Sequence, residues 1–333
     1  MSSEFGSLLK ISVFGQSHGR AIGVVVDGLP AGEAIDLEEL NAFLARRKPG
    51  KSPLSTARRE ADAPVFLSGL ENGVTCGAPL CAVIENGDQH SSDYDALRDK
   101  PRPGHADYTA FVKWGGQADM RGGGHFSGRL TAPLVFAGAV AKLILRERGV
   151  AVAAAVSNVA GIPDPTPEQM EQAVLAAKAD GDSVGGCIRC TVTGLPAGLG
   201  SPDFGCNVEG LFAQYLYAVP AVKAVAFGAG FGFAALRGSQ ANDPFYMEGE
   251  TVRTRTNRSG GVNGGITNGM PVEFEVCIRP TPSISLEQDT VDLERGCDAR
   301  LSIHGRHDPC IVPRAVVVIE AAAALASCAL LDL

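Results

Sequence analysis

Four short histidine-containing blocks, spread from one end of the chain to the other, constrain its fold more than any other feature. They are FGQSHG (residues 14–19), RPGHADY (102–108), GGGHFSGR (122–129) and RHDPC (306–310). Each block places glycine, arginine or aspartate near the histidine. Glycine lets a backbone and a ligand approach closely, and arginine offers forked donors to phosphate or carboxylate. The blocks therefore predict a fold that gathers distant segments around an anionic small molecule.

Charge and composition narrow the class of protein. The formal net charge is −8 over 333 residues, which argues against nucleic acid as a partner because nucleic-acid-binding proteins present an electropositive face. An acidic protein that binds an anion has to concentrate its arginines in one cleft. The nine cysteines are scattered, mostly through apolar runs, as expected for reduced thiols in a cytoplasmic protein.

Neither export nor membrane insertion is expected. The N-terminus has no basic-then-apolar leader. The longest apolar stretch, residues 315–331, contains Glu320 and consists mostly of alanine and valine. We therefore expect a buried C-terminal helix in this stretch and no membrane partner.

Hydrophobic periodicity predicts a mixture of strands and helices. Strands are expected at 8–14, 22–26, 65–67, 80–84, 187–192, 222–227, 232–236 and 272–278. Helices are expected after Asp36, over 132–148, from Thr166 to about Ala179, over 208–217 and after Pro313. Their order does not alternate regularly enough for a doubly wound sheet, so one α+β domain over residues 1–333 is favoured. The segment 85–124 shows little periodicity and is interpreted as a long functional loop.

Several side chains have the chemistry of a catalytic site. His18 and His105 are candidate general acids or bases because imidazole titrates near neutral pH, although a lone histidine is more often structural. Asp308 suits a base or an orienting group, and equally a turn. Arg47 and Lys48 end the helix after Asp36, where they either offset the helix dipole in solvent or reach into a cleft.

Three glycine- or hydroxyl-rich segments suit anion binding. Gly122 to Gly124, followed by Ser127 and Arg129, is typical of an anion cradle at a helix N-terminus. GGVNGG (260–265) is a second glycine loop, and RPTPS (279–283) ends a strand with one cation and two hydroxyls. Each segment taken alone is also compatible with a simple turn.

Taken in order, the blocks resemble the chorismate synthase family over nearly the whole chain. The resemblance is carried by residues 14–19 running into VVVDGLP (24–30), by 122–131 and by 306–310. RPGHADY (102–108) and LRGS (236–239) match as well.

The resemblance implies a fold, a reaction and partners. The fold would be a β-α-β sandwich, and the protein a homotetramer. The substrate would be 5-enolpyruvylshikimate 3-phosphate, converted to chorismate by an overall 1,4-elimination of phosphate. Reduced FMN would be required without net redox change. Since the chain shows no reductase segment, a separate NAD(P)H-dependent flavin reductase would supply the reduced FMN.

The resemblance also assigns roles to residues. His105 would protonate the reduced flavin, His18 the departing phosphate, and Asp308 would help relay the ring proton through the flavin. The substrate contacts would be Arg47, Lys48, Arg102 and Arg129. The flavin contacts would be His125, Phe126, Ser127, Ala221, Gly264, Arg279, Pro280, Thr281, Pro282, Ser283 and Arg306, the last also facing the substrate.

Departures from the family pattern keep a second hypothesis open. Gln16 replaces the usual glutamate, and Pro53 and Pro220 replace a basic residue and an asparagine. In the glycine block, arginine, serine, alanine and glutamate are replaced by His125, Phe126, Gly128 and Leu130. The alternative is a family member that binds flavin or an anion with reduced or lost activity. A metal-dependent hydrolase is disfavoured because no histidine pair has i,i+4 spacing on a helix.

Overall fold

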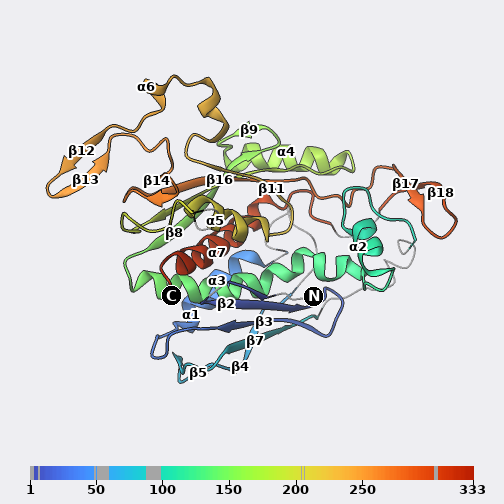
Figure 1. Cartoon of the computed structure of the whole chain (residues 1–333). Helices are drawn as coiled ribbons and strands as arrows, with labels where there is room; N and C mark the ends of the chain where they lie inside the picture. The colour runs from blue at the N-terminus through green and yellow to red at the C-terminus, as the bar shows by residue number, and fades with distance from the viewer. Residues whose placement is uncertain are drawn as a thin grey trace.

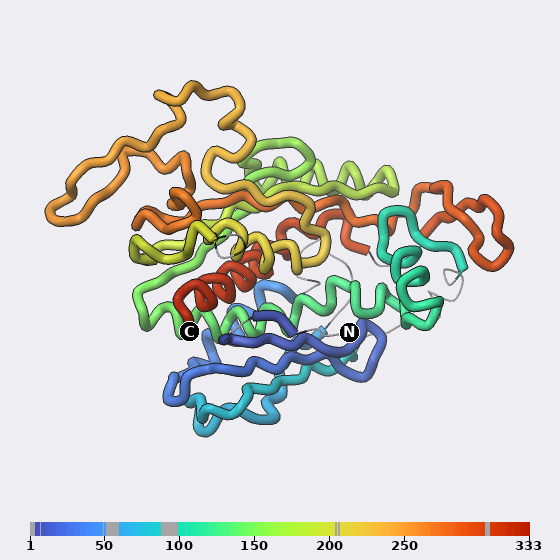
Figure 2. Tube along the Cα trace, viewed as in Figure 1, coloured from blue at the N-terminus to red at the C-terminus, as the bar shows by residue number. Residues whose placement is uncertain are grey.

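The computed structural model describes residues 4–6, 8–48, 50, 60–87, 99–203, 205, 207–303 and 307–333. Two five-stranded sheets enclose a layer of helices (Figure 1). The Cα trace in Figure 2 shows the same three layers, with both chain ends near the middle of the view. The α+β fold and the β-α-β sandwich expected from the sequence are therefore confirmed.

The first sheet is antiparallel and carries the first histidine block. Its order is β1-β2-β3-β7-β4, with bounds Glu4–Phe5, Lys10–Gly15, Ala21–Asp27, Leu80–Glu85 and Pro64–Ser68. Ile22, Val24 and Val26 alternate along β3 and are fully buried, which explains the period-two pattern. The β2–β3 connection holds His18 at one end of this sheet.

The second sheet is also antiparallel and leads into the hydroxyl-rich segment. Its order is β11-β16-β10-β8-β9, with bounds Val222–Phe227, Val272–Ile278, Gly186–Thr193, Ala151–Val159 and Ile162–Pro163. Alternate residues of β16 are buried, as its sequence predicts. The strand ends where Arg279 to Ser283 begin.

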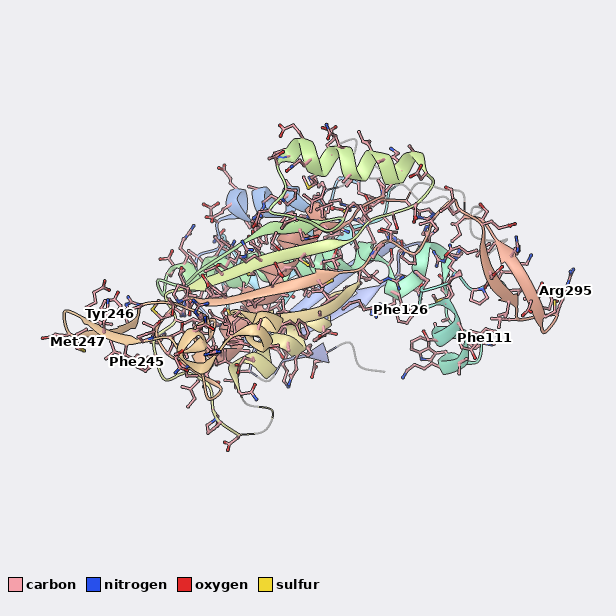
Figure 3. The ribbon with its side chains drawn as sticks, turned by 90° about the horizontal axis from the view of Figure 1, so that it is seen from above. Phe111, Phe126, Phe245, Tyr246, Met247 and Arg295 are labelled. Atoms are coloured by element: carbon pink, nitrogen blue, oxygen red, sulfur yellow. The ribbon has the colours of Figure 1, made fainter. Side chains whose placement is uncertain are left out.

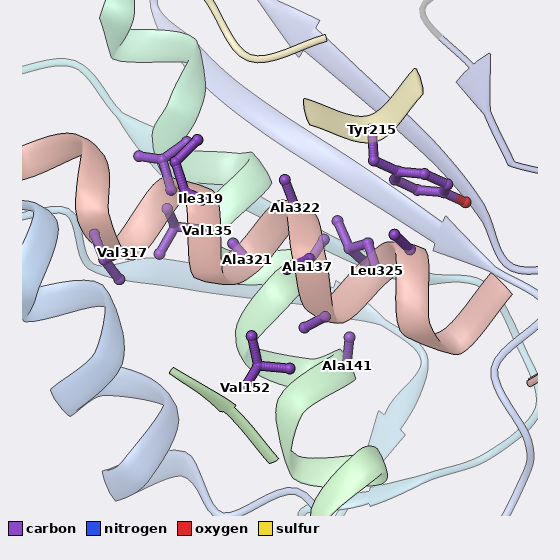
Figure 4. Close-up of a cluster of buried hydrophobic side chains, with 14 of the residues drawn as sticks. Val135, Ala137, Ala141, Val152, Tyr215, Val317, Ile319, Ala321, Ala322 and Leu325 are labelled. Atoms are coloured by element: carbon purple, nitrogen blue, oxygen red, sulfur yellow. The ribbon is translucent and has the colours of Figure 1, made fainter. Parts of the chain in front are cut away.

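Helices fill the space between the sheets. They are α1 (Leu37–Arg47), α3 (Thr131–Arg146), α5 (Val208–Tyr217) and α7 (Val312–Leu330). Figure 4 shows α3 and α7 crossing with small side chains such as Ala137 and Ala321 between them. The predicted buried C-terminal helix is confirmed. Its Glu320 is buried and ion-paired with Arg46 of α1 at 2.6 Å and Lys142 of α3 at 2.8 Å.

The remaining elements lie around this sandwich. They are α2 (Asp107–Trp114), α4 (Pro167–Ala179), α6 (Gly238–Ala241), β5 (Leu70–Glu71), β6 (Val74–Thr75), β12 (Phe245–Glu248), β13 (Thr251–Thr254), β14 (Val262–Asn263), β15 (Ile266–Thr267), β17 (Gln288–Asp292), β18 (Cys297–Leu301) and the 3₁₀ segments η2 (Arg121–Phe126), η3 (Gly128–Leu130) and η4 (Gly230–Ala235). The hairpin β12–β13 projects from one end and β17–β18 from the other (Figure 1).

Two sequence expectations are corrected. Residues 232–236 are not a strand, because 232–235 belong to η4, in which Gly230 has φ 52° and turns the chain tightly, and Leu236 caps the end of η4. Residues 85–124 are not entirely loop, because they contain the helix α2, and residues 88–98 of this segment fall outside the described residues. The other predicted helices and strands are present, with ends shifted by a few residues at most.

Two helical stretches, residues 121–146 and 312–330, are long and apolar enough to cross a membrane. Their most apolar windows are 83% and 72% buried within the protein. This burial is typical of core helices, and it matches their position between the two sheets.

Candidate active site

A large cavity opens where both sheets, the glycine block and α2 meet. Its volume is about 1320 Å³ as bounded by the described residues. Single small-ligand pockets usually occupy some 300–1,000 Å³, so this cavity is larger than one small ligand needs. The lining comes from segments that are far apart in the sequence, as the four blocks predicted.

Most of the predicted site residues line this cavity. They are Arg47, Arg102, His105, His125, Phe126, Ser127, Arg129, Ala221, Arg279, Pro280, Thr281, Pro282, Ser283 and Asp308. Three others are not part of its lining. His18 is 8% exposed and lies just behind it, Lys48 follows the end of α1, and Gly264 lies in the β14–β15 turn. Arg306 and Pro53 fall outside the described residues.

The glycine block lies between the two candidate catalytic histidines. Gly122 and Gly123 have φ of 59° and 86°, a region that favours glycine. A Cβ atom on Gly122 would lie 2.4 Å from Nε2 of His18. A Cβ atom on Gly123 would lie 3.3 Å from Nε2 of His105. Consecutive residues of one turn thus lie close to both imidazoles.

His105 belongs to a tight cluster with two charged neighbours. Its Nδ1 lies 2.7 Å from Oδ1 of Asp107. Arg102 donates from Nε to Oδ2 of Asp107 at 2.7 Å and from Nη2 to Oδ1 at 2.8 Å. Burial opposes ionisation of Asp107, but the hydrogen bonds from Arg102 and His105 outweigh it and hold the pKa of this carboxyl well below its ordinary value.

Arg47 and Arg129 share a buried carboxylate that the sequence reasoning missed. Nη1 of Arg47 donates to Oδ2 of Asp62 at 2.9 Å, and Arg129 is ion-paired with the other oxygen. Arg47 also donates to Oγ1 of Thr131 and to the carbonyl of Gly128. Burial lowers the pKa of Arg47 to about 10, with Asp62 opposing the shift. Arg47 and Arg129 therefore line the cavity, but some of their N–H donors are already bonded to groups of the protein.

Asp308 has a cationic neighbour on α7. Its Oδ2 accepts from Nη1 of Arg314 at 2.6 Å. The adjacent His307 also lines the cavity, and burial together with the charge of Arg102 lowers its pKa below the ordinary histidine value. Asp308 is thus an ion-paired carboxylate next to an imidazole that favours its neutral form.

An aromatic pair and a buried hydroxyl also belong to the lining of the cavity or lie beside it. The rings of Trp114 and Phe126 have centroids 5.7 Å apart and both line the cavity. Figure 3 shows Phe126 beside the helix that carries Phe111. Oγ1 of Thr281 is buried and has no hydrogen-bond partner among the described residues. A buried hydroxyl without a partner is costly, so it marks a place where a ligand can supply one.

His125 contacts the first sheet. Its Nδ1 lies 2.9 Å from the carbonyl oxygen of Gly15, so this nitrogen carries the proton and donates it. The ring lines the cavity and is exposed to it. Among the described residues, no group of three or more histidine, cysteine, aspartate or glutamate side chains is arranged to hold a metal ion.

Comparisons with known proteins agree with this geometry. The family model described as chorismate synthase matches residues 9–331. The chorismate synthase of Chitinophaga pinensis is 47% identical over 324 residues, covering 97% of this chain and 95% of the relative. That of Thermococcus gammatolerans is 46% identical over 335 residues, covering 95% and 94%. A crystal structure of chorismate synthase has a TM-score of 0.74 and 26% identity, covering 98% of this chain and 92% of the other.

Proposed function

The chain belongs to the chorismate synthase family, and from that premise we propose that it converts 5-enolpyruvylshikimate 3-phosphate to chorismate. The reaction is a 1,4-elimination in which the ring loses a phosphate and a proton. It makes the protein a carbon–oxygen lyase of aromatic amino-acid biosynthesis. The observation that carries the proposal is the glycine turn that lies against both His18 and His105, beside a cavity lined by arginines.

The substrate carries a phosphate and two carboxylates, and the cavity supplies positive charge for them. Arg47, Arg102 and Arg129 lie in its wall, where a low dielectric strengthens their attraction for an anion. Because many of their donors already bind Asp62 and Asp107, we propose that they act mainly through charge. Lys48 and Arg306 are proposed as further cations at the same ligand.

Each acid–base group has a defined task. His18 holds the proton that the departing phosphate takes up, and the glycine turn keeps its ring in place. His105 gives a proton from Nε2, the ring nitrogen on the Gly123 side, while its ring is cationic. Asp308 helps relay the ring proton, and its ion pair with Arg314 at 2.6 Å holds its carboxylate in place.

The cavity fits a flavin as well as the substrate. Trp114 and Phe126 offer ring faces, and Thr281 offers the buried hydroxyl without a partner. Ser127, Ala221 and the rest of the 279–283 segment line the same space, and we propose Gly264 as a further contact. Reduced FMN, when bound, supplies electron density to the reacting ring and recovers it. The protein holds the ring system and excludes water.

Flavin binding can be measured in the absence of substrate. Trp114 is the only tryptophan of the chain and lines the cavity, so FMN should quench the intrinsic tryptophan fluorescence. Thr281→Val should weaken FMN binding about 3- to 10-fold, the net value of one hydrogen bond. Thr191→Val, on β10 outside the cavity lining, is the matched control. Equal affinity of the two variants would remove Thr281 from the flavin site.

The oligomeric state and the cellular location are proposed from the family. We propose a homotetramer in the cytoplasm, supplied with reduced FMN by a separate NAD(P)H-dependent reductase. Support for self-association comes from the β12–β13 hairpin, where Phe245 is 67% and Met247 62% exposed. Figure 3 shows both on the projecting hairpin, together with Tyr246. Two strands alone are marginally stable, so such a hairpin needs a partner surface.

The activity test uses chemically reduced FMN without oxygen. With 5-enolpyruvylshikimate 3-phosphate, we expect chorismate absorbance to rise only when the protein is present. Tight FMN binding without chorismate formation would instead support the alternative, a family member that has lost activity. Gln16→Glu combined with His125→Arg would then test whether the departures from the family pattern are the cause.

A further inference from the structure

We propose that Asp107 is a positioning residue that fixes His105 in one tautomer, and that Arg102 serves mainly to hold Asp107. This inference rests on the proposed function only for the role of His105 in turnover. The geometric part concerns the protein alone.

The three side chains form a closed unit at the start of α2. Asp107 is the first residue of that helix and is 9% exposed. Its Oδ2 accepts from both the backbone N–H and Nε of Arg102, at 3.0 and 2.7 Å. Its Oδ1 accepts from Nη2 of Arg102 at 2.8 Å and lies 2.7 Å from Nδ1 of His105. The backbone N–H of His105 bonds the carbonyl of Arg102 at 3.1 Å, which closes the turn.

This arrangement decides which ring nitrogen carries the proton. The ionised carboxylate of Asp107 has no proton to donate, so a contact of 2.7 Å requires the N–H to be on Nδ1. Nη2 of Arg102 also lies 3.0 Å from Nδ1 and, as a donor, would favour the other tautomer, but the contact of Nδ1 with the ionised carboxylate is the shorter of the two. Nδ1 keeps its proton whether the ring is neutral or cationic. The proton that His105 gives or takes is therefore confined to Nε2, on the side of Gly123.

Arg102 has little left to offer a ligand. Besides its bonds to Asp107, its Nη2 lies 3.0 Å from Nδ1 of His105 and its Nη1 lies 3.4 Å from Oγ of Ser283, and its side chain is 5% exposed. A cation that is bound in this way fixes the carboxylate in place, as the fork of arginine suits two carboxylate oxygens. Arg102 therefore supports His105 through Asp107 and reaches the substrate only through its charge.

The direct test is the ¹⁵N spectrum of the histidine-labelled full-length protein without flavin or substrate. The signal that disappears in His105→Gln identifies His105 among the six histidines. In the wild type we expect the Nδ1–H form. In Asp107→Asn, whose amide group can donate to Nδ1, we expect the Nε2–H form. A wild-type ring in the Nε2–H form would overturn the proposal, whether or not the variant folds.

Kinetics provide the second readout. Asp107→Asn should lower kcat by about 10²- to 10⁴-fold with KM nearly unchanged, because without the carboxylate the cationic ring that gives its proton from Nε2 is no longer oriented and stabilised through Nδ1. Arg102→Lys should also lower kcat and leave KM nearly unchanged. A rise in KM with unchanged kcat for Arg102→Lys would make it a substrate contact and contradict the proposed support role.

A matched control separates this effect from loss of a buried charge. Asp292→Asn changes another buried aspartate, which accepts backbone N–H groups at the β17–β18 hairpin away from the cavity. It should leave both the His105 spectrum and kcat unchanged. If the protein made no chorismate at all, the spectrum would still decide the tautomer, so failure of the proposed function and of this inference are distinguishable.

Discussion

At the residue scale, the candidate site depends on pairs that form only in the folded protein. The sequence marks Arg47, Arg102 and Arg129 as cations for an anionic ligand, and all three do line the cavity. Their partners Asp62 and Asp107 were not predicted. Asp107 stands two residues after His105 in the same block, a spacing that offered a signal. Asp62 offered none, because its contacts with Arg47 and Arg129 depend on how the chain folds back.

The first prediction concerns the glycine turn. Gly122→Ala places a Cβ atom 2.4 Å from the buried His18 ring and forces alanine to φ 59°, which costs about 1–2 kcal/mol. His18 has to move, so turnover should fall by roughly 10²- to 10⁴-fold while the fold persists. Steady-state kinetics with circular dichroism measure both. Gly149→Ala is the control, since it also forces alanine to a positive φ (75°) while its Cβ atom meets nothing within 4 Å and it lies outside the cavity lining. Equal activity of the two variants would show that the turn does not position His18.

At the element scale, periodic segments were predictable and segments defined by contacts were not. The strand β16 alternates cleanly, and Thr166 caps α4 with the reciprocal bond from Gln169, so both were found from the sequence. The strand β8 was missed, because AVAAAVSNV consists mostly of small residues that show no strong period. Helix α2 was missed inside a polar, glycine-rich segment, although it carries Asp107 and Trp114.

The second prediction concerns the crossing of α3 and α7. A Cβ atom on Gly138 would lie 2.2 Å from Cβ and 2.4 Å from Cα of Ala321, so the two helices touch at their backbones. Gly138→Ala should separate them and destabilise the protein by about 1–3 kcal/mol. Denaturant unfolding measures the loss. The double variant with Ala321→Gly should recover part of it, and no recovery would place the strain elsewhere.

At the scale of the whole molecule, the β-α-β sandwich explains how distant blocks meet. The β2–β3 turn, the start of α3, the end of β16 and the start of α7 all reach the same end of the helical layer (Figure 1). The sequence predicted that the four histidine-containing blocks form one site. The sandwich fold was predicted from the resemblance to the family. The sequence did not predict the exposed apolar hairpin β12–β13, because no core periodicity marks an element that projects from the body.

The third prediction concerns that hairpin. If it is covered in a homotetramer, Phe245→Asp with Met247→Asp should lower the mass measured by light scattering, because two charges enter an apolar contact. Thr251→Asp, on the same hairpin, is the control and should keep the wild-type mass. A wild-type protein that is already monomeric, or a double variant of unchanged mass, would contradict this role.

The most direct test of the proposed function is a stoichiometry. Phosphate released, chorismate formed and flavin oxidised would be measured together in one anaerobic reaction with catalytic reduced FMN, for the wild type and for His105→Ala. An elimination without net redox change predicts equal amounts of phosphate and chorismate, repeated turnovers per flavin and no accumulation of oxidised FMN. His105→Ala should slow both phosphate release and chorismate formation about 10²- to 10⁴-fold. Phosphate without chorismate, or flavin oxidised in step with product, would contradict the account.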